Sequence, residues 1–133
     1  MESTGTTSIR ELEAPPRLLL RPNRGSFATE EAALKAVVRR LVDALRPLRI
    51  YLFGSRAEGR ARPDSDFDLV VVLDDDAPNR DADYDDVYRP IQGLGVGCDV
   101  IPCTASEFND VLSDPTNSWR DSWSLAQKVY TRP

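Results

Sequence analysis

The end of one predicted core strand, a polar loop and the whole of the next core strand lie within residues 53–73, which read FGSRAEGRARPDSDFDLVVVL. The last seven residues, from Phe67 to Leu73, are almost continuously apolar, which is typical of a strand buried on both faces. Residues 49–53 are rich in branched and aromatic side chains and predict a shorter strand that Gly54 and Ser55 end. The segment therefore predicts two buried strands joined by a polar connection.

Helices and further strands are expected on both sides of this segment. Apolar residues at three- and four-residue spacing predict a helix from Thr29 to Arg46, with Thr29 as its cap. Further helices are expected from within residues 74–86 to about 92, over 104–112 and weakly over 119–127, with strands over 98–102 and 128–131. This order predicts an α/β (α+β) fold with a small mixed central sheet flanked by helices.

Composition narrows the chemistry that the chain can perform. The 133 residues include no histidine and two cysteines, which excludes Ser-His-Asp triads, histidine-bearing zinc sites and a disulfide framework. Lysine and arginine number 17 against 22 acidic residues, so the net charge of −5 disfavours direct nucleic-acid binding. Carboxylates, hydroxyls and arginines remain, and carboxylate oxygens favour hard metal ions such as Mg²⁺.

The ends of the chain and its hydropathy suggest one domain and no membrane segment. Prolines and small polar residues predict a flexible N-terminal tail over residues 1–25, followed by a single domain over residues 26–133. No apolar run approaches the roughly 18 residues that cross a bilayer, and the first residues lack a secretory pattern. We therefore expect a cytoplasmic protein.

Two aspartates at the start of the second core strand are the first candidates for chemistry. Asp66 and Asp68 are two residues apart, so their carboxylates point to the same face of a strand. Like charges this close repel each other unless a cation compensates them, and Mg²⁺ suits a few carboxylates together with phosphate oxygens. A solvated turn is the alternative interpretation of the pair.

The end of the preceding strand is suited to phosphate. Gly54 allows a sharp turn and a close approach of the backbone to a ligand, and a following helix would direct its free N–H groups to the same place. The Ser55 hydroxyl adds a donor, and the Arg56 guanidinium matches phosphate oxygens, although a surface role for Arg56 is the alternative. Together with the aspartates these are the parts of a phosphoryl- or nucleotidyl-transfer site.

The spacing of these groups resembles the minimal nucleotidyltransferase family of the DNA polymerase beta-like nucleotidyltransferase superfamily. Gly54-Ser55, ten residues, and Asp66-Phe67-Asp68 form its signature, and the match extends to Gly59 and Ser65. The resemblance implies a polymerase beta-like fold and a third carboxylate on a later strand, which Asp99 supplies. It implies that Asp66, Asp68 and Asp99 are catalytic and bind two Mg²⁺ ions, and that Gly54, Ser55, Arg56 and Ser65 bind the nucleotide phosphates.

A short chain with this signature resembles the stand-alone antitoxins of HEPN/MNT toxin–antitoxin pairs (type VII). The resemblance implies transfer of AMP from ATP to a tyrosine hydroxyl of a HEPN-domain ribonuclease toxin, with release of pyrophosphate. Two alternatives stay open at this point. The chain could neutralise its partner by binding alone with a vestigial site, or it could be a small-molecule (antibiotic) nucleotidyltransferase whose acceptor site is completed by a dimer.

Two other features have an ordinary explanation and a functional one. The seven aspartates within residues 74–86 fit a solvated face and a helix start, or a docking surface for a basic partner. Trp119 and Trp123 are four residues apart and can share a helix face, where core packing is expected. An exposed tryptophan pair would instead mark an interface.

Overall fold

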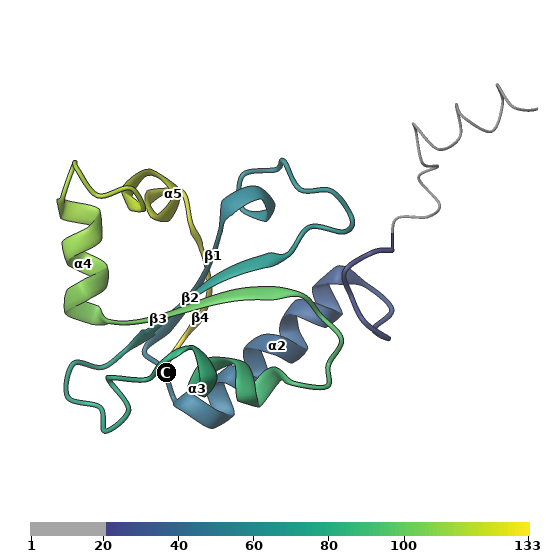
Figure 1. Ribbon diagram of the computed structural model, residues 1–133, viewed down its shortest axis with the longest axis horizontal. Coiled ribbons are helices and arrows are strands. Elements are labelled where there is room, and N and C mark those ends of the chain that lie inside the picture. The colour runs from purple at the N-terminus through teal and green to yellow at the C-terminus, as the bar shows by residue number, and fades with distance from the viewer. Residues whose placement is uncertain (1–20) are drawn as a thin grey trace, which may run out of the picture.

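A four-stranded mixed sheet forms the centre of the computed structural model, which describes residues 21–133 (Figure 1). The strand order is β3-β2-β1-β4, with β1 antiparallel to β2 and β4, and β2 parallel to β3. Along the chain the elements are α2 (Glu30–Leu45), β1 (Arg49–Phe53), η2 (Gly54–Arg56), β2 (Phe67–Leu73), α3 (Tyr84–Tyr88), η3 (Arg89–Ile91), β3 (Cys98–Thr104), α4 (Ala105–Ser113), α5 (Arg120–Ser124) and β4 (Gln127–Thr131). The predicted α/β (α+β) fold with a small mixed sheet flanked by helices is confirmed.

The first described residues lie against the domain. Residues 1–20 of the predicted flexible tail lie outside the described residues. The backbone N–H of Asn23 donates to the carbonyl of Pro63 at 2.7 Å. The folded domain therefore includes Asn23, which lies before the boundary that the sequence places at residue 26.

Capping residues set the ends of the helices as the sequence predicts. The Thr29 hydroxyl accepts a hydrogen bond from the N–H of Ala32 at 3.0 Å and so begins α2. Thr104 and Glu107 exchange side-chain and backbone hydrogen bonds in a capping box at the start of α4, the helix predicted over residues 104–112. No helix within residues 21–133 combines the length and the apolar composition that a bilayer-spanning segment needs.

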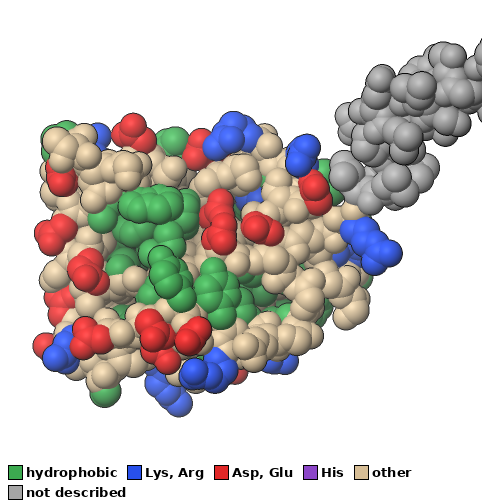
Figure 2. Space-filling model, in the orientation of Figure 1, with side chains coloured by type: hydrophobic (Ala, Val, Ile, Leu, Met, Phe, Trp, Pro, Cys, Tyr) green, Lys and Arg blue, Asp and Glu red, His purple; other side chains and the backbone are tan. Residues whose placement is uncertain are grey.

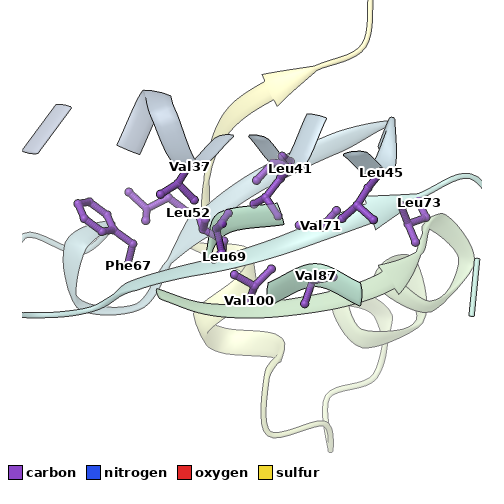
Figure 3. Packing of buried hydrophobic residues seen from close by; sticks show 12 residues of the cluster. Val37, Leu41, Leu45, Leu52, Phe67, Leu69, Val71, Leu73, Val87 and Val100 are labelled. Carbon is purple, nitrogen blue, oxygen red and sulfur yellow. The ribbon is translucent and has the colours of Figure 1, made fainter. Parts of the chain in front are cut away.

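Helices cover both faces of the sheet because side chains alternate along β2. Leu69 and Val71 belong to the cluster that packs against α2 and α3, and Figure 3 shows Leu41 of α2 beside this cluster. Val70 and Val72 point the other way and pack with residues of α4 and α5. Every residue of β2 except Asp68 is buried, so this strand is a rigid base for the Asp68 side chain.

The parallel pairing of β2 and β3 requires a crossover, which residues 74–97 provide. Within it α3 begins at Tyr84, inside the predicted range of residues 74–86, and Asp83 and Asp86 form a capping box around its first turn. The α-helix then gives way to the 3₁₀ turn η3, which contains Pro90 and so lacks one backbone donor. The crossover returns the chain to the end of the sheet at which β2 begins, so that β3 starts beside the start of β2.

We expect Leu41→Ala to lower the free energy of unfolding by about 3 kcal/mol, because it leaves a cavity between α2 and the sheet. Leu41 is fully buried, whereas Leu125 is 58% exposed and provides a control. Urea unfolding of both variants measures the difference. A change of less than about 1 kcal/mol for Leu41→Ala, with Leu125→Ala unaffected, would contradict this core arrangement.

Candidate active site

Two aspartates on neighbouring strands face each other at the start of the parallel pair. The register of β2 and β3 pairs Asp68 with Asp99, and paired residues carry their side chains on the same face of a sheet. The Asp99 carboxyl is close enough to Asp68 to contribute to a raised pKa of the Asp68 carboxyl. Asp66 lies just before β2, and its carboxylate packs so closely on Gly97 that a methyl group there would overlap it. The structure thus brings Asp68 and Asp99 together and places Asp66 beside the start of β3.

Burial and the neighbouring carboxylates raise the pKa values of two side chains at this site. Burial is the largest cause that raises the pKa of Asp68 from 3.8 to about 6, followed by the charges of Asp99 and Asp66. Burial and the same three carboxylates raise the pKa of the Cys98 thiol to about 12, so this thiol stays protonated at neutral pH. The site is therefore a concentration of negative charge that a cation would relieve.

The raised pKa of Asp68 predicts a pH-dependent stability. Between about pH 4 and pH 6 the Asp68 carboxyl keeps its proton in the folded chain but loses it in the unfolded chain. Asp68 therefore contributes stability that is fully present below about pH 4 and is lost as the pH rises through 6. We expect Asp68→Asn to be more stable than the wild type by about 1 kcal/mol at pH 7.5 without divalent metal, since water screens a partly exposed carboxyl. The difference should vanish near pH 4.

Urea unfolding between pH 4 and pH 8 in the presence of a chelator measures this difference. Asp110→Asn removes an exposed charge from α4 and should follow the wild-type pH profile. An Asp68→Asn variant that is no more stable than the wild type at pH 7.5 would show that the carboxylates do not repel one another in the folded chain.

Gly54 lies directly beside the carboxylate of Asp68, and Ser55 follows it in the chain. Gly54 has a φ of +72°, in the left-handed region that glycine adopts freely, and a side chain there would overlap the Asp68 carboxylate. The sharp turn predicted for Gly54 is therefore present, and the group that its backbone approaches is Asp68. The helix expected after it is only the 3₁₀ turn η2, and Gly59, with a φ of +75°, lies just beyond it.

The Arg56 side chain is held by contacts within the chain. Its side chain is only 8% exposed and forms an ion pair with Glu30 at 2.8 Å. The guanidinium lies over the ring of Phe67, 4.1 Å from the centroid, and donates to the carbonyls of Pro63 and Ser65 at 3.2 and 2.7 Å. This arrangement gives Arg56 a structural role in holding the loop of residues 56–65, and its contact with phosphate stays a prediction.

Ser65 also takes part in the loop. Its hydroxyl accepts a hydrogen bond from the N–H of Arg62 at 2.9 Å, and its carbonyl accepts from Arg56. These bonds fix the backbone one residue before Asp66. Its predicted role in phosphate binding likewise stays a prediction.

Asn23 is a positioning residue that the sequence analysis missed. Its amide nitrogen donates to the carbonyls of Ser65 and Gly97 at 2.9 and 2.8 Å, and its amide oxygen accepts from the N–H of Gly97 at 2.6 Å. One side chain thus ties the residue before Asp66 to the start of β3, two residues before Asp99. A lone asparagine among prolines carries no sequence signal for such a contact, because its partners lie 42 and 74 residues away.

We expect Asn23→Ala to lower the free energy of unfolding by about 2 kcal/mol, because it removes three partly buried hydrogen bonds and leaves their partners unsatisfied. Asn109→Ala, at an exposed position of α4, is the matched control and should change stability by less than about 0.5 kcal/mol. Urea unfolding compares the two. Equal effects would show that Asn23 does not hold the two segments together.

One comparison with known proteins identifies the family of the chain. Residues 25–121 match the nucleotidyltransferase domain family. The chain belongs to that family. The matched segment of this nucleotidyltransferase contains Gly54, Ser55 and all three carboxylates. A provisionally assigned nucleotidyltransferase of known structure from Sulfolobus solfataricus is similar, with 22% identity, a TM-score of 0.49, and coverage of 74% of this chain and 78% of that chain. No curated protein sequence matches the chain.

The carboxylate oxygens of the nucleotidyltransferase are suitable ligands for a divalent cation. Within residues 21–133 no three acidic, cysteine or histidine side chains surround a common ion position. The donor set is nevertheless the one that Mg²⁺ prefers. Burial and the charges of Asp99 and Asp66 raise the pKa of Asp68, and a bound cation would offset both by favouring the ionised carboxylate. Asp68 and Asp99 are the adjacent pair that would hold such an ion first, with Asp66 next to them.

Proposed function

We propose that the chain is an Mg²⁺-dependent nucleotidyltransferase that transfers AMP from ATP to a tyrosine hydroxyl of a HEPN-domain ribonuclease toxin, as its antitoxin. The observation that carries the reaction class is the row of carboxylates next to the Gly54 turn, in a chain of the nucleotidyltransferase family. The nucleotide, the acceptor and the antitoxin role follow the resemblance to minimal nucleotidyltransferases and are part of the proposal.

The proposed reaction is one displacement at phosphorus. The acceptor oxygen forms a bond to the α-phosphorus of ATP, and the bond from that phosphorus to the bridging oxygen of pyrophosphate breaks. The proton of the acceptor hydroxyl moves to a carboxylate oxygen of Asp99, for which the exposed position of this side chain is suited. Bound Mg²⁺ would neutralise the charge of the triphosphate and of the leaving pyrophosphate.

Several residues of the protein hold the carboxylates in fixed positions before the reaction. Burial of β2 fixes Asp68, and Asn23 and Arg56 hold the loop that leads to Asp66. Gly54 allows the backbone before Ser55 to lie directly against Asp68, so a phosphate bound at this turn would be adjacent to the carboxylates. Preorganised groups of this kind lower a barrier because they need no rearrangement during the reaction.

A protein acceptor is compatible with the exposure of the site. Asp66 and Asp99 are both exposed on the surface formed by residues 21–133. A tyrosine hydroxyl at the end of a long, rigid side chain can therefore reach Asp99 from solvent. This exposure supports a macromolecular acceptor, whereas an acceptor pocket lined by a second copy of the chain would support a small molecule.

Transfer of radiolabel from α-³²P-ATP to a candidate HEPN-domain acceptor in the presence of Mg²⁺ tests the proposal. We expect wild-type labelling with release of pyrophosphate, and a loss of about a hundredfold or more in Asp66→Asn/Asp68→Asn, because the metal-binding charges are gone. Asp81→Asn/Asp85→Asn makes the same change in net charge on the exposed acidic stretch and should label like the wild type.

Other outcomes would replace the proposal with one of the alternatives. Neutralisation of the toxin by Asp66→Asn/Asp68→Asn, with no label on the partner in the wild type, would show an antitoxin that acts by binding. Labelling of an aminoglycoside by the purified chain alone would show a small-molecule nucleotidyltransferase.

A further inference from the structure

An exposed tryptophan lies at the border of the candidate site. Trp119 is 44% exposed, whereas Trp123, four residues later, is 5% exposed and belongs to the core. The two rings stack with centroids 6.0 Å apart, and Trp119 meets the ring of Phe53 edge-on at 5.7 Å. The predicted core packing of the pair is therefore present for Trp123, but Trp119 keeps much of a large apolar ring in solvent.

The backbone of Trp119 is held in place. Its N–H donates to the side-chain oxygen of Asn117 at 2.8 Å, and its carbonyl accepts from the N–H of Trp123 at 2.9 Å. Phe53 and Trp123 contact its ring from the core side. The indole is thus an exposed surface with little freedom to move away.

The register of the sheet places this ring next to the carboxylates. Asp99 pairs with Asp68, and Asp68 pairs with Phe53 on the other side, so the three side chains form one row across the same face. Trp119 contacts Phe53 at the end of that row. Paired side chains in a sheet have Cβ atoms about 5 Å apart, so the indole lies within the length of a nucleotide from Asp68.

The surface view agrees with this placement. Figure 2 shows hydrophobic side chains gathered between α4, α5 and the strands, directly beside acidic side chains. An apolar patch bordering carboxylates suits a ligand with a flat apolar part and a charged part that needs a cation.

We propose that Trp119 is the stacking surface for the nucleobase of the nucleoside triphosphate, an inference that rests on the proposed function. Gly54 and Ser55 directly follow Phe53, so the predicted phosphate turn and Trp119 lie on the same side of Asp68. Asp99, which faces the acceptor in the proposed reaction, lies on the other side. A ligand ring that stacks on Trp119 would therefore belong to the base of the nucleotide and not to the acceptor.

Two ligands separate the base contact from the phosphate contact. The full chain is titrated by calorimetry with Mg²⁺ and AMP-CPP, an ATP analogue with a carbon bridge between the α and β phosphorus atoms. A second titration uses Mg²⁺ and inorganic tripolyphosphate, which has no base. We expect Trp119→Ala to weaken AMP-CPP binding about tenfold, the effect of one lost base–aromatic stack, and to leave tripolyphosphate binding unchanged.

Two further variants test the chemistry of the contact. Trp119→Phe keeps an aromatic face and should retain most of the AMP-CPP affinity, whereas Trp119→Leu keeps apolar bulk and should lose it. Leu125→Ala removes another exposed apolar side chain, 58% exposed, and should change neither affinity. Should Trp119→Ala fail to fold, the Trp119→Phe and Trp119→Leu pair carries the same comparison.

The outcomes distinguish this inference from the proposed function. Equal AMP-CPP affinity in the wild type and Trp119→Ala would overturn the base contact and leave the proposed function standing. The same holds if Trp119→Ala lowers only the transfer of label to the acceptor. Equal weakening of both ligands would also overturn it, because the whole site would then be disturbed. A wild type that binds neither ligand would overturn the proposed nucleotidyl transfer as well.

Discussion

The in-register parallel pairing of β2 with β3 is the constraint on which the rest of the site depends. It sets two carboxyl groups side by side at the start of the buried strand β2 and its neighbour β3, where burial and the nearby carboxylates raise the pKa of Asp68. At neutral pH the chain gains no stability from this arrangement, so its presence points to a ligand that removes the repulsion. The crossover through α3 exists because parallel strands cannot be joined by a tight turn, and it brings Asp99 back to the edge where β2 begins.

The parts of the fold that local sequence determines were predictable. Both core strands have the predicted limits, because Arg49–Phe53 and Phe67–Leu73 are apolar runs bounded by a glycine turn and by acidic residues. The caps of α2 and α4 also follow from single side chains and their neighbours. The spacing from Gly54 to Asp68 pointed to the nucleotidyltransferase family before any geometry was known, since spacing alone carries that signature.

The surroundings of the site were not predictable, because they depend on contacts between distant segments. Arg56 has the same sequence signature whether it meets phosphate or turns inward to Glu30 and Phe67. Asn23 acts on loops that follow it by 42 and 74 residues. Trp119 and Trp123 look equivalent in the sequence, and only the packing of Phe53 and Phe108 buries one and leaves the other exposed.

The length of β2 separates the acidic residues at its far end from the candidate site, which matters for a polyanion approaching a chain of net charge −5. The aspartates at positions 74–76 follow the far end of this strand, about six residues or ~20 Å from Asp68. The Debye length at physiological ionic strength is about 8 Å, so their field is largely screened before it reaches the site. These aspartates therefore add little to the electrostatic barrier that a nucleotide meets at the site, and cations bound by the carboxylates of the site itself would lower that barrier.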